Sequence, residues 1–176
     1  MTFELHLELL GRLLLGGVLG AVIGYERDLH GRPAGLRTHA IVGLASSTFM
    51  VVSIAFVYFQ NYEHGGIAEV DVSRIAASVV SGIGFLAGGA ILRTGLTVQG
   101  LTTAAGLWLV AAIGLAAGGG MYAASLVATI AGVTVLTVLR RFEDKTDDRA
   151  RGELKLVLVD DGAVLTAAKA ALAQLD

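Results

Sequence analysis

The sequence lacks cysteine, has a single proline and carries few charged residues. The absence of cysteine excludes disulfide bonds, thiolate metal sites and cysteine nucleophiles. Charged residues make up only 16% of the 176 residues, whereas soluble domains average about 25%. Hydrophobic residues make up 55% of the chain, which also contains 24 glycines. This composition indicates a membrane protein, and the net charge of −2 gives no sign of general nucleic-acid binding.

Motifs for catalysis are also absent from the sequence. It contains no P-loop, no zinc motif and no pairing of a nucleophile with a base. The four histidines, at positions 6, 30, 39 and 64, are scattered over different segments. We therefore expect that the protein is not an enzyme.

Five apolar runs approach the roughly 20 residues that a membrane-spanning helix needs. The first contains Glu8 and Arg12, which are four residues apart and can pair on one helical turn. It lacks a basic leading segment and an obvious cleavage site, which favours a retained helix over a signal peptide. The third and fourth runs are short and rich in glycine, so tilted or re-entrant segments are alternatives there. The expected spans are 7–25, 38–59, 75–92, 101–117 and 121–139.

The positions of arginine and lysine in the short loops predict the orientation. Residues 24–39 contain three arginines outside the apolar runs, Arg93 follows the third run, and five basic residues lie between 140 and 151. Residues 60–74 instead hold three acids and one arginine. The predicted fold class is therefore an all-α polytopic membrane protein with about five transmembrane helices. Its N-terminus is expected outside and its C-terminus in the cytoplasm.

The end of the chain differs in character from the rest. Residues 1–140 form the expected transmembrane domain, and residues 141–152 read as a charged linker. The stretch ELKLVLV then predicts a strand, and AVLTAAKAALAQL predicts an amphipathic helix. One strand and one helix cannot bury a core alone. Residues 153–176 are therefore interpreted as the start of a small cytoplasmic βα domain that is incomplete here, with pairing to another chain as the alternative.

Glycines repeat at four-residue intervals in the first span, at Gly16, Gly20 and Gly24. Small residues at this spacing let helix backbones approach closely. Packing within one bundle is the favoured interpretation. The alternative is the seam of a homodimer.

Polar residues of the third segment recur at helical spacing. Asp71, Arg74, Ser78 and Ser81 share one helical face, which continues toward Gly82, Gly84 and Gly88. A polar stripe on a membrane helix usually faces the bundle interior or a wet cavity. A structural Asp71–Arg74 pair at the helix entrance is an equally weighted alternative.

The fourth span begins with two threonines. Thr102 or Thr103 is expected to cap the helix or to bond a carbonyl of a neighbouring helix. Trp108 falls in the middle of the span and is expected to pack inside the bundle. Structural roles are favoured for all three residues.

The densest charge lies in GYERDLHGRPAGLRTH, residues 24–39, whose glycines and proline break any helix between the first two spans. Its arginines fix the topology, but acids contribute little to topology. Glu26 and Asp28 are therefore expected to form ion pairs that brace the loop, such as Glu26 with Arg37. A metal site made of these acids with His30 and His39 is a weaker alternative, because the spacing matches no ligand motif.

Three stretches in this order resemble the MgtC/SapB family of bacterial inner-membrane proteins over roughly residues 7–140. They are GYERDLHGRPAGLRTH, DVSRIAASVVSGIGFLAGGAIL and GLTTAAGLWLVAAIGLAAGGGMY. The family commonly reads GFLGAG where this chain has GFLAGG, a swap of small residues. The residues carried over by position are Glu26, Arg27, Ala34, Gly35, Leu36, Arg37, Thr38, Asp71, Arg74, Ser81 through Leu86, Gly100 through Ala105, and Trp108.

The resemblance implies a multi-pass inner-membrane protein linked to growth in low magnesium and, in pathogens, to survival inside host cells. It favours a regulator that binds other membrane proteins, including the F-type ATP synthase, and a homodimer is the expected assembly. Longer members carry a cytoplasmic ACT-like domain, whose beginning the βα tail fits. The alternative is a small divalent-cation transporter or channel, with Mg²⁺ as the candidate ion and a path along the Asp71–Ser81 stripe and Glu26. Divalent cations want about six oxygen ligands, and few acids lie at membrane depth.

Overall fold

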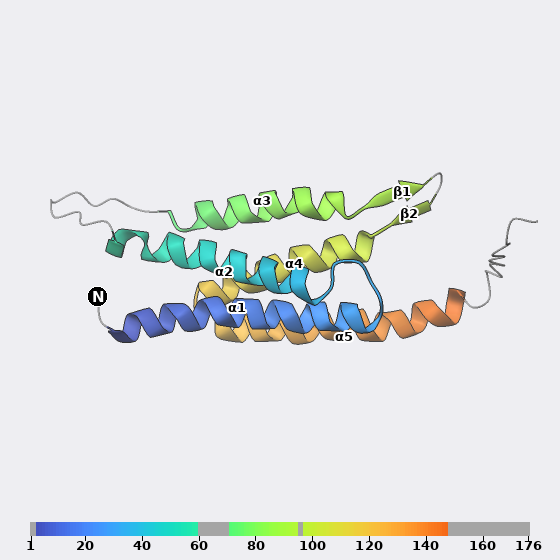
Figure 1. The fold of residues 1–176 in the computed structure, drawn as a ribbon, viewed down its shortest axis with the longest axis horizontal. Coiled ribbons are helices and arrows are strands. Elements are labelled where there is room, and N and C mark those ends of the chain that lie inside the picture. The colour runs from blue at the N-terminus through green and yellow to red at the C-terminus, as the bar shows by residue number, and fades with distance from the viewer. Residues whose placement is uncertain (1–2, 60–70, 95–96, 148–176) are drawn as a thin grey trace, which may run out of the picture. The chain divides into compact units, whose positions relative to one another are not determined.

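The computed structural model describes the backbone of residues 3–59, 71–94 and 97–147, and the side chains of these residues except 57–59, 94 and 141–147. This part of the chain forms five helices and one pair of short strands (Figure 1). The elements are α1 (Phe3–Leu29), α2 (Leu36–Phe59), α3 (Ser73–Gly89), β1 (Leu92–Thr94), β2 (Thr97–Gln99), α4 (Leu101–Gly118) and α5 (Tyr122–Asp147).

The helical fold expected from the sequence is confirmed. Four helices, α1, α2, α4 and α5, are long and apolar enough to cross a membrane. The third helix, α3, is also apolar but has only 17 residues, so it is not counted among these candidate spans. It ends at Gly89, because consecutive glycines weaken a helix and the chain then enters β1. The antiparallel pair β1–β2, with Arg93 opposite Val98, follows the third apolar run. From the sequence, this connection served only to predict the orientation in the membrane, through Arg93.

Glycine lets α1 and α2 approach to backbone contact. A Cβ at Gly16 would lie 2.6 Å from the Cβ of Ser47, and one at Gly24 would lie 2.7 Å from the Cα of Leu36. A Cβ at Gly20 would collide with the carbonyl of His39. Gly16, Gly20 and Gly24 therefore pack against α2 of the same chain, as the favoured interpretation expected. Without side chains at these positions, the two helix backbones come into direct contact.

The fourth helix lies at the centre of the bundle, and its burial exceeds that of the other spans. Its residues supply half of the main apolar core, which joins it to α1, α2 and α3. The core residues are Leu19, Ile23, Val42, Ile83, Leu107, Val110, Ala111 and Ile113. Figure 1 shows α3 along one side of the bundle, with β1 and β2 beyond its C-terminal end.

The fifth helix is longer than expected. It runs through Asp147 and so takes in part of the segment that was interpreted as a linker. It packs on α1 and α4 at Gly132, where an added Cβ would lie 2.6 Å from Leu109 and 3.1 Å from Ile23. The residues fall into two compact units, Met1–Arg141 and Phe142–Asp176. The strand and helix expected at 153–176 lie outside the described residues.

Candidate functional site

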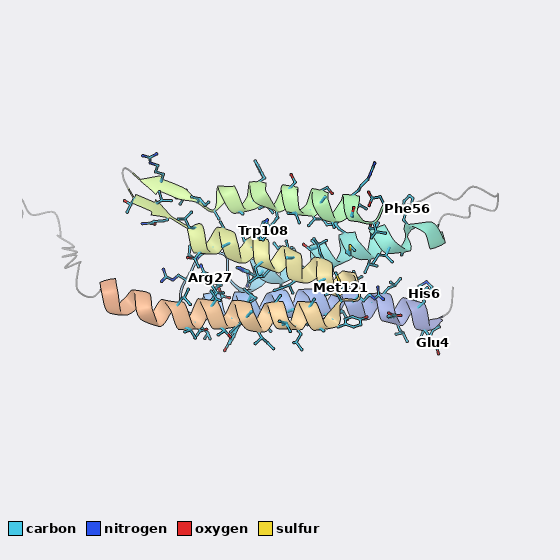
Figure 2. All side chains as sticks on the ribbon, turned by 180° about the vertical axis from the view of Figure 1, so that it is seen from behind. Glu4, His6, Arg27, Phe56, Trp108 and Met121 are labelled. Atoms are coloured by element: carbon cyan, nitrogen blue, oxygen red, sulfur yellow. The ribbon has the colours of Figure 1, made fainter. Side chains whose placement is uncertain are left out.

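A buried arginine joins the end of α1 to the start of α4. Arg27 is only 5% exposed, and its Nη2 donates a hydrogen bond of 2.6 Å to Oγ1 of Thr103. Figure 2 places Arg27 at the opposite end of the bundle from Glu4 and His6, and the bond to Thr103 directs its side chain to α4. The interaction links residues 76 positions apart and ties together two of the four candidate spans.

Local sequence places both partners of this bond. Arg27 lies in the last turn of α1, where a cation interacts favourably with the negative end of the helix dipole. Thr103 lies in the first turn of α4, which begins after Gly100 with a positive φ of 88°. A side chain at Gly100 would also collide with the carbonyl of Ala90, so this turn requires glycine.

Glu26 is buried beside Arg27 and pairs with a histidine. It is 8% exposed, and its Oε1 lies 2.9 Å from Nδ1 of His30, one turn further along. The same His30 nitrogen lies 2.7 Å from the backbone carbonyl of Glu26. The expected pairing of Glu26 with Arg37 is therefore wrong, because Arg37 lies on the exposed first turn of α2 while Glu26 faces the bundle.

His39 on α2 completes the group. Its ring is fully buried, and Nδ1 lies 3.0 Å from the carbonyl oxygen of Gly35. A carbonyl only accepts, so Nδ1 carries the proton and Nε2 is left as an acceptor. Gly106 of α4 faces this nitrogen, since an added Cβ would lie 3.4 Å from it. We call Glu26, Arg27, His30, His39 and Thr103 the polar cluster.

The polar cluster is buried but incompletely paired. Glu26 Oε2, Arg27 Nε and His39 Nε2 have no hydrogen-bond partner among the protein groups of the described part. A buried donor or acceptor without a hydrogen bond costs about 1–3 kcal/mol of stability. Unpaired buried polar groups of this kind are usually explained by an ordered water, a bound ion or a functional role.

The loop between α1 and α2 is braced by Asp28. Its Oδ2 accepts a hydrogen bond of 2.9 Å from the backbone N–H of Leu36, and so caps the start of α2. A side chain at Gly35 would collide with the Asp28 carboxylate. Ala34 adopts a positive φ of 55°, which is uncommon for a residue other than glycine. The acids thus brace the loop as expected, but through a cap and a histidine and not through arginine.

The alternative of a metal site at this loop finds no support. Within the residues that the structure describes, no group of three or more His, Asp or Glu side chains could hold a metal ion. Glu26 pairs with His30, whereas Asp28 accepts from the backbone N–H of Leu36.

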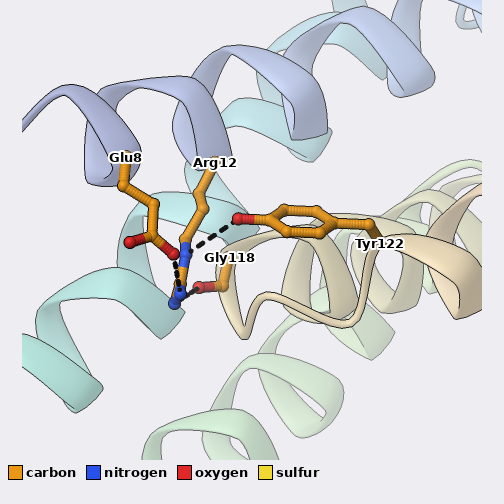
Figure 3. A network of polar contacts seen from close by, with 4 residues as sticks. All are labelled: Glu8, Arg12, Gly118 and Tyr122. Atoms are coloured by element: carbon orange, nitrogen blue, oxygen red, sulfur yellow. Dashed lines mark hydrogen bonds and ion pairs between the residues drawn. The ribbon is translucent and has the colours of Figure 1, made fainter. Parts of the chain in front are cut away.

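A second polar network lies at the other end of the bundle (Figure 3). Arg12 on α1 pairs with Glu8 at 2.6 Å, as its sequence spacing predicts. The same guanidinium donates to the hydroxyl of Tyr122 at 3.3 Å and to the carbonyl of Gly118 at 3.4 Å. Gly118 is the last residue of α4, so Arg12 satisfies a carbonyl that the helix itself leaves free. The sequence signal identified the ion pair but not these long-range bonds.

The polar stripe of α3 faces outward. Asp71, Arg74, Ser78 and Ser81 are all exposed, whereas Ile83 and Ala87 are the buried residues of this helix. Ala87 follows Ser78 by nine positions, which places the two about 180° apart around the helix. The expectation that the stripe faces the bundle interior is therefore wrong for this chain, because the apolar positions of α3 contact α4 instead.

Asp71 caps the start of α3. Its Oδ1 accepts from the Ser73 hydroxyl at 2.5 Å and from the Ser73 backbone N–H at 3.0 Å. These two hydrogen bonds lower the pKa of the Asp71 carboxyl, with a smaller contribution from the charge of Arg74. Arg74 Nε lies 3.6 Å from Asp71, and both side chains are solvent-accessible. The expected Asp71–Arg74 pair is present.

Several other predicted residues lie on the surface. Trp108 is 52% exposed and does not pack inside the bundle as expected, because the buried face of α4 is formed by its small and aliphatic residues (Figure 2). Thr102 is exposed beside the buried Thr103. Arg37 and Thr38 are exposed at the start of α2. An added Cβ at Gly82, Gly84 or Gly88 would meet nothing within 4 Å, so these glycines face open space.

Sequence reasoning missed the buried face of α2. His39, Gly43 and Ser47 are four residues apart, and all three are buried against α1 or α4. Ser47 donates to the carbonyl of Leu13 on α1 at 3.1 Å. The spacing that singled out the glycines of α1 applies equally here and would have found this face.

Comparisons with known proteins identify related chains. The model of the MgtC family matches residues 13–145. A protein of Escherichia coli K12 named "Putative magnesium transporter YhiD" is 39% identical over 158 residues, which cover 89% of this chain and 72% of that protein. "Protein MgtC" of Brucella abortus is 41% identical over 132 residues, 75% of this chain but only half of that protein. An uncharacterized protein of Synechocystis is 42% identical over 123 residues, 70% of this chain and 48% of that protein. No solved structure matches.

Proposed function

This chain belongs to the MgtC family of bacterial membrane proteins, and we propose that it is a regulator that acts by contact with other membrane proteins. We further propose that its action is linked to magnesium limitation and, in a pathogen, to survival inside host cells. No enzymatic activity is part of this proposal. Its proposed partners are a second copy of the chain, forming a homodimer, and other membrane proteins such as the F-type ATP synthase.

The outward stripe of α3 is the observation that supports contact. Its Ser78 and Ser81 hydroxyls lie on the side of α3 opposite the bundle, together with Gly82, at which an added Cβ would meet nothing. Polar groups facing lipid are costly, and small residues allow a second helix to approach closely. A neighbouring protein helix would cover this face better than lipid chains.

A matched pair of substitutions tests this surface. Ser78 donates to the Ile75 carbonyl within its own helix, and Thr134 on α5 does the same to Ile130. Both are exposed, so Ser78→Leu and Thr134→Leu make comparable changes on different faces. We expect Ser78→Leu, combined with Ser81→Leu, to reduce both dimer formation and co-purification of ATP synthase, while Thr134→Leu leaves them unchanged. Undiminished assembly in the α3 variant, at wild-type yield, would contradict the proposal.

A magnesium transporter is the second candidate, favoured by the name of the Escherichia coli relative. The path proposed for it runs along α3 from Asp71 and uses glycine carbonyls and Glu26. Mg²⁺ prefers about six oxygen ligands, and no described group of three acidic or histidine side chains converges. A dimer would double the ligands available.

Flux into liposomes separates the two candidates. If the protein transports magnesium by this path, an internal indicator will report entry with the wild type and none with Asp71→Ala. Equal flux in both proteins would remove Asp71 from the path. No flux in a folded, correctly inserted wild type would favour the regulator.

A further inference from the structure

A crevice of about 750 Å³ lies between α2, α3 and α4 at the end where the α1–α2 loop turns. Its walls come from the last turns of α3, including Phe85 and Gly88, from Thr38 and Val42 of α2, and from Leu107 of α4. Thr38 is the one lining residue with a polar side chain. The volume falls within the range of about 300–1,000 Å³ that is common for small-molecule sites.

The crevice exists because α3 supplies little side-chain volume there. Gly84, Gly88 and Gly89 line it, and a Cβ added at any of them would meet nothing within 4 Å. Ile83 and Ala87 are the residues of α3 that are buried against the bundle, and Gly84 and Gly88 lie beside them around the helix, where they leave room at the edge of this contact. An apolar space of this kind, open at membrane depth, suits a hydrocarbon chain.

Two arginines lie close in sequence to lining residues at one end of the crevice. Ala34 and Thr38 line it, and Arg32 and Arg37 lie two and one positions before them in the sequence. Both arginines are exposed, and neither side chain forms a hydrogen bond or ion pair with a residue that the structure describes. The N-terminal end of α2 lies here too, but the Asp28 carboxylate already accepts from its Leu36 N–H and compensates its partial positive charge. The two exposed arginines exceed this one carboxylate, so the end of the apolar slot carries a net positive charge.

We propose that this crevice binds an anionic phospholipid, with one acyl chain between α2 and α3 and the phosphate held by Arg32 and Arg37. The distribution of basic residues predicts that this end faces the cytoplasm, where anionic lipids make the membrane surface negative. Basic pockets between helices on that side are the usual place for such headgroups. Charge complementarity at the rim favours this occupant over an apolar helix. The site is independent of the α3 stripe and of the regulator proposal.

Lipid retention measured by native mass spectrometry tests the proposal. The full chain is reconstituted with phosphatidylglycerol or phosphatidylcholine of identical acyl chains and then released into detergent. Gly88→Leu fills the crevice, and Gly82→Leu is its control, because Gly82 is equally open and does not line the crevice. Arg37→Gln removes a rim charge, and Arg74→Gln is its control at the other end of α3.

We expect the wild type to retain phosphatidylglycerol in preference to phosphatidylcholine. Arg37→Gln should weaken that retention about fivefold, since a basic residue near the surface contributes of that order. Gly88→Leu should abolish it, and both controls should retain as much phosphatidylglycerol as the wild type, whatever their effect on assembly. Equal retention of the two lipids, or retention unchanged in Arg37→Gln, would overturn the proposal. A lower dimer fraction in Gly88→Leu with unchanged lipid retention would also overturn it, because a second copy would then occupy the crevice.

Discussion

Arg27 at the end of α1 donates a hydrogen bond from Nη2 to Oγ1 of Thr103 at the start of α4, at 2.6 Å. Both residues are at most 5% exposed, so the bond is shielded from water. A hydrogen bond to a charged group is stronger than one between neutral groups. The bond also fixes the register of α1 against α4 beside the buried ring of His39.

Replacing Thr103 with valine keeps the shape and removes the acceptor. We expect Thr103→Val to lower the free energy of unfolding by about 1–3 kcal/mol, because the buried guanidinium loses its partner. Thermal unfolding in detergent, followed by circular dichroism, measures the change. Thr102→Val is the control, since Thr102 is the exposed neighbour. Equal stability of the two variants would contradict a role for the Arg27–Thr103 bond.

The contact between α1 and α2 predicts a contrast between two glycines. A Cβ at Gly20 collides with the backbone of His39, whereas one at Gly17 makes an ordinary contact of 3.4 Å with Leu44. We expect Gly20→Ala to destabilise the protein by roughly 1–3 kcal/mol, as overpacking usually does. Gly17→Ala should be neutral or slightly stabilising, because alanine favours the helix. Unfolding temperatures of the two variants decide this, and a harmless Gly20→Ala would mean that the helices are not in backbone contact.

The network at Arg12 predicts unequal effects of its members. The Glu8 side chain is about half exposed, at 49%, so Glu8→Gln should cost less than about 1 kcal/mol. Arg12→Lys should cost more, because an ammonium cannot reproduce the planar set of donors that reaches Glu8, Tyr122 and Gly118. Chemical unfolding in detergent compares them. A larger loss for Glu8→Gln would show that the ion pair, and not the long-range bonds, dominates.

The cap at the start of α3 predicts a pH dependence. Hydrogen bonds from Ser73 lower the pKa of Asp71, so the charged form is favoured in the folded protein. Its contribution is fully present above the ordinary pKa of about 3.9 and is lost as pH falls through the lowered value. We therefore expect no change in the cap between pH 5 and 8.

Carbon NMR of the Asp71 carboxyl measures this titration. Ser73→Ala should raise the Asp71 pKa toward its ordinary value, because the hydroxyl donor is lost. Ser78→Ala is the control, since Ser78 bonds the Ile75 carbonyl and not Asp71. An Asp71 pKa that is the same in all three proteins would show that Ser73 does not hold the carboxylate.

Much of the helical fold was predictable because hydrophobic runs are local signals. All five helices lie where the apolar runs predict them, and the Glu8–Arg12 pair follows from i, i+4 spacing. Helix ends were less accurate, and α5 extends to Asp147 although charge begins at Arg140. Charged residues are compatible with a helix beyond the bilayer, so hydropathy alone does not mark its end.

The candidate site was only partly predictable. Glu26, Arg27 and Thr103 were singled out, but the Arg27–Thr103 bond was not predicted, and His30 and His39 were considered only as metal ligands. A four-residue spacing at His39, Gly43 and Ser47 was available in the sequence. The pairing of Glu26 with His30 instead of Arg37 depends on the turn at Ala34 and Gly35, which sends Arg37 to the surface.

The sequence by itself determined that this chain is an apolar helical protein of the membrane, because hydrophobicity and glycine spacing act within one helix. Only the tertiary structure decided that Arg27 meets Thr103 across 76 positions and that the polar side of α3 faces outward. The periodicity of α3 defines two opposite faces but not which of them contacts the bundle. That choice depends on α4, whose apolar side chains take Ile83 and Ala87 into the core.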